Sequence, residues 1–463
     1  MVIPLLQTIC KPLFGTFEKE EFKKFLRMGL VFALIIGSYW TLRVLKNSIF
    51  GDLVNPSLHL PWAKGVSLLM MFPLVGMYTK LLDKFSREKM FYVLSAIYSA
   101  LTLLFGLIFV LTKQVSADQY TGVAHIAVTV LAYAWYVFVE SYGSLFPALF
   151  WAFATDITIP DSAKKGFPLV VAIGQIGGIF GPWLIGGLPK RLGISMSGAA
   201  LFACVPAVFL VIACVRYLLK ATPKDLLTSF HGKNETVKEH EQEPGFFEGL
   251  KLLLSNKYLI GIFSSIAIYE VIITIFDYNF QILAKLQIPD SAERAAYLSA
   301  YGSYVNLVAL VCLLLGVSNI TRLLGVGVAL VMMPIIVGGA LTGFMSFDSL
   351  HFLFWLMVGS KAINYALNGP AMKQLYIPTT HDVRFKAQAW IETFGSRGAK
   401  EGGMLVNALL VPFQKMFGEV VGRARYIALT GYLGFSLLIV WFFFALFLGR
   451  TYKKAVDNKQ VVC

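Results

Sequence analysis

Long apolar runs recur along the whole chain and constrain its fold more than any other feature. A run of about 20 apolar residues is long enough to cross a bilayer as a helix. The sequence contains twelve such runs, which predict membrane spans at 28–49, 63–82, 90–112, 122–154, 165–188, 197–219, 257–283, 296–316, 323–345, 349–373, 386–411 and 426–449. The predicted fold class is therefore an all-α polytopic membrane protein with 12 transmembrane helices.

The composition excludes several other classes of protein. Only 14% of the 463 residues are charged and 57% are hydrophobic, whereas a soluble protein has about 25% charged residues. A soluble enzyme, a disordered chain and a nucleic-acid-binding module are therefore excluded. The net charge of +14 is explained by the excess of Lys and Arg that membrane proteins carry on their cytoplasmic face. With the N-terminus inside, the cytoplasmic segments hold roughly three times as many basic residues as the opposite face. Both termini are therefore predicted to be cytoplasmic.

One polar stretch divides the chain into two parts that resemble each other. It predicts an N-terminal six-helix half at 1–220, a cytoplasmic linker at 221–256 and a C-terminal six-helix half at 257–463. Residues 142–182 and 365–403 share an order of Tyr, Pro-Ala, Ile-Pro, Asp, Lys and a Gly-rich helix. The corresponding pairs are Pro147 and Pro370, Asp161 and Asp382, Lys165 and Lys386, and Gly174 and Gly395. Two six-span halves of one parent unit are the architecture of major facilitator transporters.

The loop after the second predicted span supports the same architecture. Its sequence KLLDKFSREK, from Lys80 to Lys89, resembles the loop signature of major facilitators, with Asp83 and Arg87 at matching places. We interpret it as a cytoplasmic latch in which nearby cations hold an acidic group. The alternative is that these cations only mark the cytoplasmic side.

Ionisable residues inside spans point to a functional site, because each costs about 2.5–3.5 kcal/mol on insertion scales. Four spans carry polar stripes at helical spacing, and we expect these stripes to line one water-filled cavity. The stripes are Tyr39, Arg43, Lys46 and Asn47; Tyr133, Tyr136, Glu140, Ser144 and Pro147; Glu270, Thr274, Asp277, Tyr278 and Gln281; and Glu392, Ser396, Lys400, Gly403 and Asn407, with Arg397 on the flank of the last.

The cations of these stripes suit a phosphorylated ligand. Arg43 and Arg397 can hold phosphate oxygens bidentately, while Lys46 and Lys400 act as point charges. Nearby Tyr and Trp rings offer faces on which a base can stack. The alternative is that Lys46–Glu140 and Asp277–Lys400 are structural ion pairs. An ion pair that a substrate phosphate displaces combines both interpretations.

Several motifs resemble the nucleotide transporters of plastids and obligate intracellular bacteria, the ATP/ADP translocase family. Its first-span motif Leu-Arg-Asp-Thr-Lys-Asp is matched by LRVLKN at 42–47. Its fourth-span pattern is matched by Glu140 and Ser144 followed by LFWAFA at 149–154. Its later Tyr-Ile-Pro and Gly-Lys-Ser-Gly-Gly motifs are matched by residues 376–378 and by AKEGG at 399–403.

The resemblance implies which residues take part in transport. The two lysines and two acidic residues implicated in that family fall on Lys46, Glu140, Asp277 and Lys400. Asp277 stands where the family has Glu, and Val44 and Asn47 replace two aspartates, which leaves the first span more basic. The short N-terminal segment lacks the pattern of a plastid leader, and this favours a bacterial inner membrane.

These observations predict a carrier, not an enzyme, that moves nucleotides by alternating access, with ATP/ADP exchange as the main expectation. Proton-coupled uptake of a nucleotide or of NAD stays open, as does a major facilitator carrier for another organic anion. A membrane enzyme would be expected to carry a recognisable catalytic motif. Here the six histidines are dispersed, and no hydrolase, metalloprotease or phosphate-loop motif is present. The scattered cysteines have no metal-ligand spacing. We expect no cofactor, no metal site and no nucleic-acid partner, and a monomer in the lipid bilayer.

Overall fold

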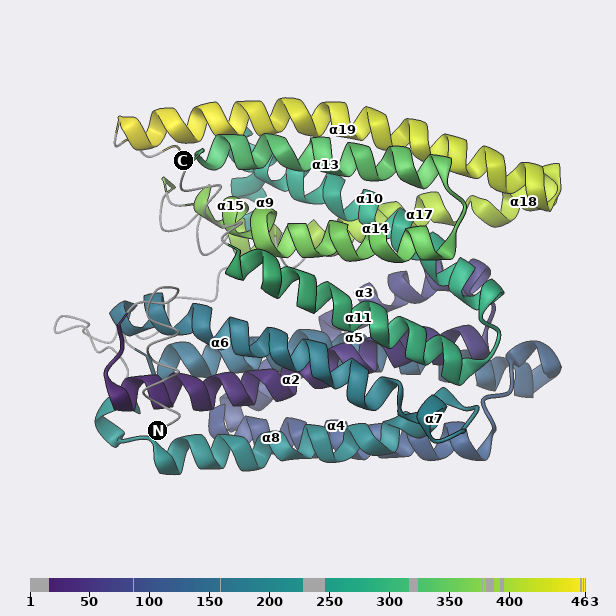
Figure 1. The fold of residues 1–463 in the computed structure, drawn as a ribbon, viewed down its shortest axis with the longest axis horizontal. Coiled ribbons are helices and arrows are strands. Elements are labelled where there is room, and N and C mark those ends of the chain that lie inside the picture. Colours follow the sequence, from purple (N-terminus) through teal and green to yellow (C-terminus); the bar gives the residue numbers. More distant parts are fainter. Residues whose placement is uncertain are drawn as a thin grey trace. The chain divides into compact units, whose positions relative to one another are not determined.

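The computed structural model describes residues 16–85, 87–158, 160–227, 246–315, 324–376, 378–379, 387–391, 395–458, 460 and 462. The regular elements that these residues form are all helices (Figure 1), which confirms the predicted all-α fold. Within the described part, ten helices are long and apolar enough to cross a membrane. The chain is therefore a multi-pass membrane protein.

Two of the twelve predicted spans do not correspond to one of these ten long helices. The span expected at 349–373 consists of α14 (Leu350–Ile363), a π-helical turn η5 (Asn364–Asn368) and α15 (Gly369–Gln374). Pro370 lies in the first turn of α15. Proline lacks the backbone N–H and its ring clashes with the preceding helical turn, so a wider π-turn before it relieves the conflict. The described helices of the span expected at 386–411 are α16 (Gln388–Trp390), α17 (Ser396–Asn407) and the start of α18 (Leu410–Phe417).

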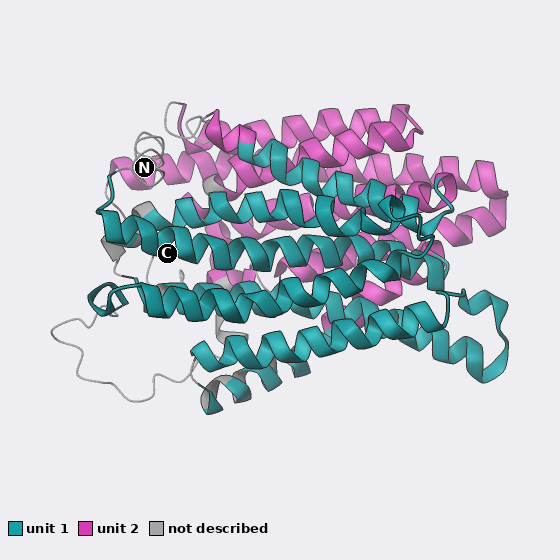
Figure 2. Ribbon diagram, turned by 60° about the horizontal axis from the view of Figure 1, so that its bottom comes forward, with its two compact units in different colours: residues 1–55, 69–235, 288–310 teal, residues 56–68, 236–287, 311–463 magenta. Residues whose placement is uncertain are grey.

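The chain forms two compact units (Figure 2). Unit 1 comprises Met1–Asn55, Leu69–Glu235 and Ile288–Leu310, and unit 2 comprises Pro56–Leu68, Thr236–Gln287 and Val311–Cys463. Each unit thus contains most of one predicted half together with the first part of one long helix, α3 (Pro56–Lys84) or α11 (Ser291–Leu314). The division into halves at 221–256 stays a prediction, and part of that linker lies outside the described residues.

The remaining helices have the following bounds. Unit 1 contains α2 (Lys19–Leu53), α4 (Arg87–Leu111), η1 (Ala117–Gln119), α5 (Gly122–Asp156), α6 (Pro160–Gly181), η2 (Pro182–Gly186), α7 (Leu188–Arg191), η3 (Ser197–Ala200), α8 (Leu201–Ala221) and η4 (Lys224–Leu227). Unit 2 contains α9 (Phe246–Ser255), α10 (Lys257–Gln287), α13 (Val326–Ser346), α18 (Leu410–Phe417) and α19 (Glu419–Asp457).

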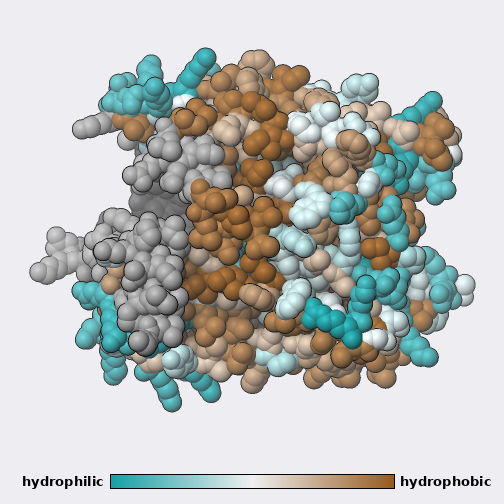
Figure 3. All heavy atoms as spheres, viewed as in Figure 1, coloured by the Kyte–Doolittle hydropathy of each residue, from teal (hydrophilic) through white to brown (hydrophobic). Residues whose placement is uncertain are grey.

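Large apolar side chains are exposed on the outer faces of these helices. Leu69, Ile335 and Phe443, which lie well inside their helices, are 63%, 60% and 64% exposed, which is unfavourable in water and favourable in lipid. On the face drawn in Figure 3, hydrophobic residues gather over the middle stretches of the helices and hydrophilic residues lie toward their ends. This pattern fits helices that cross a bilayer.

In unit 1, α2 packs closely along α6 because small residues meet at the contact. A Cβ added at Gly177 would overlap the carbonyl oxygen of Ala33, and one at Gly37 would lie 2.9 Å from the carbonyl oxygen of Gly177. Without a hydrophobic driving force between helices in lipid, such close backbone approach supplies much of their association through dispersion contacts. The Gly177–Ala33 contact therefore fixes the distance between α2 and α6.

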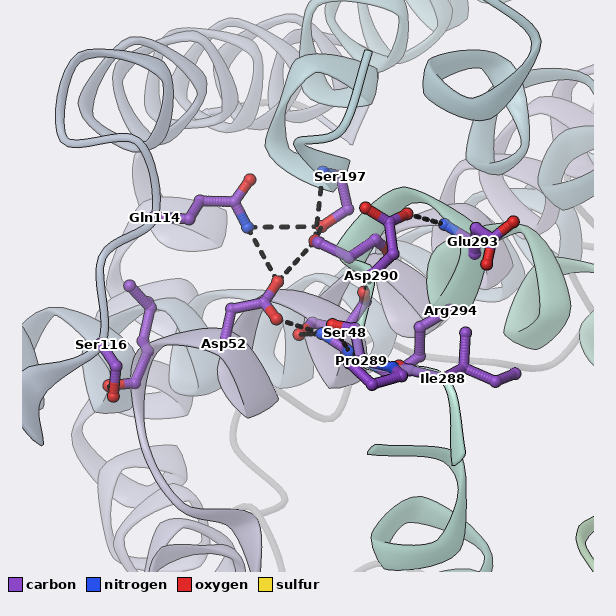
Figure 4. A network of polar contacts seen from close by, with 12 residues as sticks. Ser48, Asp52, Gln114, Ser116, Ser197, Ile288, Pro289, Asp290, Glu293 and Arg294 are labelled. Carbon is purple, nitrogen blue, oxygen red and sulfur yellow. Dashed lines mark hydrogen bonds and ion pairs between the residues drawn. The ribbon is translucent and has the colours of Figure 1, made fainter. Parts of the chain in front are cut away.

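A buried ion pair attaches the start of α11 to the end of α2 within unit 1 (Figure 4). The Arg294 guanidinium bonds the Asp52 carboxylate, and these side chains are 2% and 10% exposed. Arg294 also donates to the carbonyl oxygens of Ile288, Pro289 and Ser48 at 2.8, 3.0 and 3.2 Å. These bonds satisfy much of the donor capacity of the guanidinium, as a buried charge requires.

The second oxygen of Asp52 extends this network to two further loops. It accepts hydrogen bonds from Ser291 and, at 3.2 Å, from Gln114. The Gln114 side chain in turn accepts from the backbone N–H of Gly198 at 2.9 Å, and Ser197 Oγ lies 2.7 Å from Ser291 Oγ. Asp52 thus connects the helix ends around it, as Figure 4 shows.

The glycine contact predicts a difference between two identical substitutions. Gly177→Ala should lower the thermal unfolding temperature of the purified protein, because overpacking costs about 1–3 kcal/mol. Gly339→Ala on α13 is the matched control, since a Cβ there meets nothing within 4 Å. Equal unfolding temperatures for the two variants would contradict the close α2–α6 contact.

The buried ion pair makes a second prediction. Asp52→Asn should destabilise the protein by about 3–5 kcal/mol, because it leaves a buried guanidinium without a counter-charge. Asp348→Asn should change stability by less than about 1 kcal/mol, since Asp348 is 62% exposed in its pair with Arg423. Thermal unfolding in detergent measures both. A tolerated Asp52→Asn variant would show that the network does not hold these helix ends.

Candidate functional site

The structure places the six predicted site residues on four helices. In unit 1, Arg43 and Lys46 lie on α2 and Glu140 lies on α5; in unit 2, Asp277 lies on α10, and Arg397 and Lys400 lie on α17.

Lys46 and Glu140 form the expected ion pair. The Lys46 ammonium bonds Glu140 Oε1 and also lies 3.9 Å from the ring centroid of Tyr136. The Lys46 side chain is only 5% exposed, whereas that of Glu140 is 37% exposed. The charge of the buried lysine is therefore balanced by a carboxylate and by the negative face of an aromatic ring. A ligand that approaches this pair meets the carboxylate first.

Arg43 lies one turn before Lys46 and stacks on aromatic rings. Its guanidinium carbon is 4.9 Å from the Trp40 ring centroid, and Nη1 lies 3.4 Å from Tyr39 Oη. A Cβ at Gly143 on α5 would overlap the Tyr39 ring, so this glycine allows Tyr39 to pack against α5. Stacking leaves the edge of a guanidinium able to bond an oxyanion bidentately.

Asp277 lies between two lysines from different helices. Its Oδ1 is 3.5 Å from the ammonium of Lys361 on α14, and its Oδ2 is 3.7 Å from that of Lys64 on α3. The three side chains are 17%, 7% and 18% exposed, respectively. Two ammonium groups therefore converge on one carboxylate in a largely buried part of unit 2.

The local structure of α14 explains how Lys361 reaches this position. Ser349 caps the start of α14 by accepting from the N–H of Phe352, which fixes the helix register. Lys361 lies in the last turn before the π-turn η5. The carbonyl oxygen of the preceding residue, Ser360, lies 3.4 Å from Tyr269 Oη on α10. The end of α14 is therefore held against α10 where Lys361 projects.

The second lysine–carboxylate pair of unit 2 is Lys400 with Glu270. Their charged atoms are 3.6 Å apart, and Ser396 donates to Glu270 at 3.1 Å. Lys400 is 45% exposed and Glu270 is 18% exposed, which is the reverse of the pair in unit 1. A Cβ at Gly403 would lie 2.9 Å from the Val271 carbonyl oxygen, so α17 packs closely on α10 beside this pair.

Of the two ion pairs that the sequence suggested, Lys46–Glu140 is formed. The second was Asp277 with Lys400, whereas the contacts described above join Lys400 to Glu270, and Asp277 to Lys64 and Lys361. Lys64 stands next to the predicted start of its span, where a cation indicates a membrane boundary. Arg397 lies half-buried on α17. Asp382, Lys386 and Glu392 lie outside the described residues, as do the side chains of Asp83, Arg87, Asp161 and Lys165.

Comparisons with solved structures agree on the fold. A bacterial homologue of the lysosomal transporter Spinster, in an inward-facing unoccupied conformation, matches with a TM-score of 0.59 at 16% identity and covers 95% of this chain and 98% of its own. An inward-facing bacterial homologue of the iron transporter ferroportin matches with a TM-score of 0.62 at 10% identity and covers 90% and 98%. The architecture is major-facilitator-like.

Comparisons of sequence identify the family. ADP,ATP carrier protein 1 of Rickettsia typhi is 24% identical over 487 residues, which cover 96% of each chain. The chloroplastic ADP,ATP carrier protein 1 of Arabidopsis thaliana is 26% identical over 474 residues, covering 92% of this chain and 73% of its own. The family model described as TLC ATP/ADP transporter matches residues 7–355. The chain belongs to the TLC ATP/ADP transporter family.

Proposed function

We propose that this protein exchanges ATP for ADP across a bacterial inner membrane by alternating access, as a monomer with both termini in the cytoplasm. Membership of an ATP/ADP transporter family supports a nucleotide as cargo. The observation that carries the proposal is that lysines inside apolar helices are paired with carboxylates, Lys46 with Glu140 and Lys400 with Glu270. Phosphate oxygens can replace carboxylate oxygens beside each lysine, so the charge of the lysine is not left buried alone.

The different exposure of the two pairs suggests an order of contacts. The Lys400 ammonium is the more exposed member of its pair, so an incoming polyphosphate reaches it directly. Lys46 lies beneath Glu140, and phosphate reaches it only after that carboxylate moves. Arg43, stacked on Trp40, can hold a phosphate beside the same pair.

Exchange is favoured over proton symport by the way the lysines are neutralised. When no nucleotide is bound, Glu140 and Glu270 each pair with a lysine of their own unit, so no proton is needed to balance these lysines. Val44 and Asn47 stand where the family has aspartates, and fewer acidic groups compete with phosphate for Lys46. Proton-coupled uptake is the competing mechanism. It differs from exchange in needing a proton gradient and no ADP inside.

The first functional prediction concerns cargo and coupling. In liposomes that contain the protein, uptake of labelled ATP should require ADP inside and should not change with an uncoupler, because exchange consumes no proton gradient. Unlabelled nucleotides should compete better than nucleosides, since the cations recognise phosphate. Equal competition by nucleosides would refute a nucleotide cargo, and uptake that needs an inward proton gradient would make the protein a symporter.

The second functional prediction concerns the lysines. Lys46→Met, which keeps the volume of a buried side chain, and Lys400→Ala should each weaken ATP binding more than about tenfold, because a bond to a charged group contributes about 1.5–3 kcal/mol. Lys→Arg should restore binding only in part. Lys23→Ala is the control, since Lys23 pairs with Glu20, which is 44% exposed. Wild-type affinity in both test variants would leave these lysines with a structural role alone.

A further inference from the structure

The first part of α11 belongs to unit 1, but the chain continues into unit 2 at both of its ends. Ile288–Leu310 lies in unit 1, whereas Gln287 before it and Val311 after it lie in unit 2. By sequence the same segment is part of the predicted C-terminal half, 257–463. Alternating access is largely a rigid-body rocking of one half against the other. Such a movement either breaks the contacts that hold this segment among helices of the N-terminal half or leaves the segment behind.

One group of these contacts is the Asp52 network described above (Figure 4). Besides the Arg294–Asp52 pair, Ser48 Oγ on α2 donates to the carbonyl oxygen of Ser291 at 3.0 Å. Ser197 Oγ lies 2.7 Å from Ser291 Oγ. Ser291 and Arg294 belong to the predicted C-terminal half, and their three partners belong to the N-terminal half. The network therefore joins the two predicted halves of the chain inside unit 1.

The second group of contacts joins α11 to backbone carbonyl oxygens of α6. Ser303 Oγ donates to the Ile179 carbonyl oxygen at 2.7 Å. The side-chain amide of Asn306 donates to the Gly178 carbonyl oxygen at 3.3 Å. Pro182 follows Gly178 by four residues and has no N–H, so it cannot supply the usual helical hydrogen bond to that oxygen. A side chain of α11 therefore supplies a donor at the point where proline interrupts the hydrogen bonding of α6.

These contacts are made by hydroxyl, amide and charged groups. Helices that stay together in a bilayer can rely on small residues and dispersion contacts, as Gly177 and Ala33 do between α2 and α6. Polar groups can instead bond water when their protein partner moves away, and they would be strongly destabilising only without either. A junction of this composition suits a contact that opens to water. The alternative is a permanent polar attachment, which a cross-link would not disturb.

We propose that the first part of α11 is a gate, which its contacts with the Asp52 network and with α6 hold closed, and which separates from α2 and α6 in each transport cycle. The inference rests on the proposed alternating access and adds the element that moves. Under the proposed orientation, Asp52 and Ser291 follow the first and seventh predicted spans and so lie on the outer side of the membrane. The gate then controls access to the transporter from outside.

A reversible cross-link tests whether this segment has to move. Ser197→Cys and Ser291→Cys in one chain place two thiols where two hydroxyl oxygens lie 2.7 Å apart, so a disulfide can form between neighbouring side chains. In liposomes, oxidation of this double variant should lower ATP/ADP exchange at least tenfold, because the gate is then held closed. A reducing agent should restore the exchange. Mass spectrometry of the digested protein measures the cross-linked fraction.

The two single variants control for effects of the oxidant. Ser197→Cys alone and Ser291→Cys alone keep the native cysteines but cannot form the cross-link, so oxidation should not change the exchange rate of either. Equal inhibition of the single variants, or a fully cross-linked chain that exchanges as fast as its reduced form, would overturn the gate. A wild-type protein that exchanges no nucleotide would instead refute the proposed function, so the two failures are distinguishable.

The reactivity of a buried thiol gives a second test that needs no cross-link. Ser299 on α11 is 1% exposed, and a Cβ at Gly186 of η2 would overlap its hydroxyl oxygen. In the purified full-length protein, Ser299→Cys should react with a small charged thiol reagent at least tenfold faster than Cys204, because opening of the gate exposes it. Cys204 is the matched control, since it is fully buried in unit 1 on α8, outside the proposed gate. Equal reactivity of the two thiols would show that the segment stays in place and would overturn the proposal.

Discussion

An ionisable group inside an apolar helix bundle has to be neutralised, and this constraint governs the polar structure of the protein. Burying a single charge costs several kcal/mol, and a partner recovers that cost only when geometry and hydrogen bonding are good. The clusters described in both units meet the requirement with side chains from different helices. The packing of helices therefore decides which charges meet, and close contacts such as Gly177 against Ala33 and Gly403 against Val271 set that packing.

The same constraint gives the three lysine clusters different properties. Lys46 is more buried than its partner Glu140, whereas Lys400 is more exposed than its partner Glu270. Lys64 and Lys361 both lie near the Asp277 carboxylate. An anion meets an ammonium group first at Lys400 and a carboxylate first at Glu140.

The sequence predicted the fold class and most spans because apolar length and helical periodicity are local properties. It also selected Lys46, Glu140, Asp277 and Lys400, since each lies on a polar stripe of its own helix. It did not predict the partners of Asp277, because these depend on which face of α3 and α14 lies beside α10. The break in the span 349–373 was also missed. Pro147 lies inside the continuous helix α5, whereas Pro370 follows a π-turn, and the two prolines look alike in sequence.

The first parts of α3 and α11 each attach to their unit through a cation that meets a carboxylate. These helices are the second spans of their predicted halves, and each gives its first part to the unit that contains most of the other half. Each first part carries a cation that meets a carboxylate, Arg294 with Asp52 and Lys64 with Asp277. The Arg294 guanidinium also donates to three backbone carbonyl oxygens. Most of its donors are therefore already used within the protein. The Lys64 contact is long and is shared with a second lysine. The two helix attachments therefore differ in geometry: the Arg294 pair is surrounded by backbone acceptors, whereas the Lys64–Asp277 contact is longer and includes a second lysine.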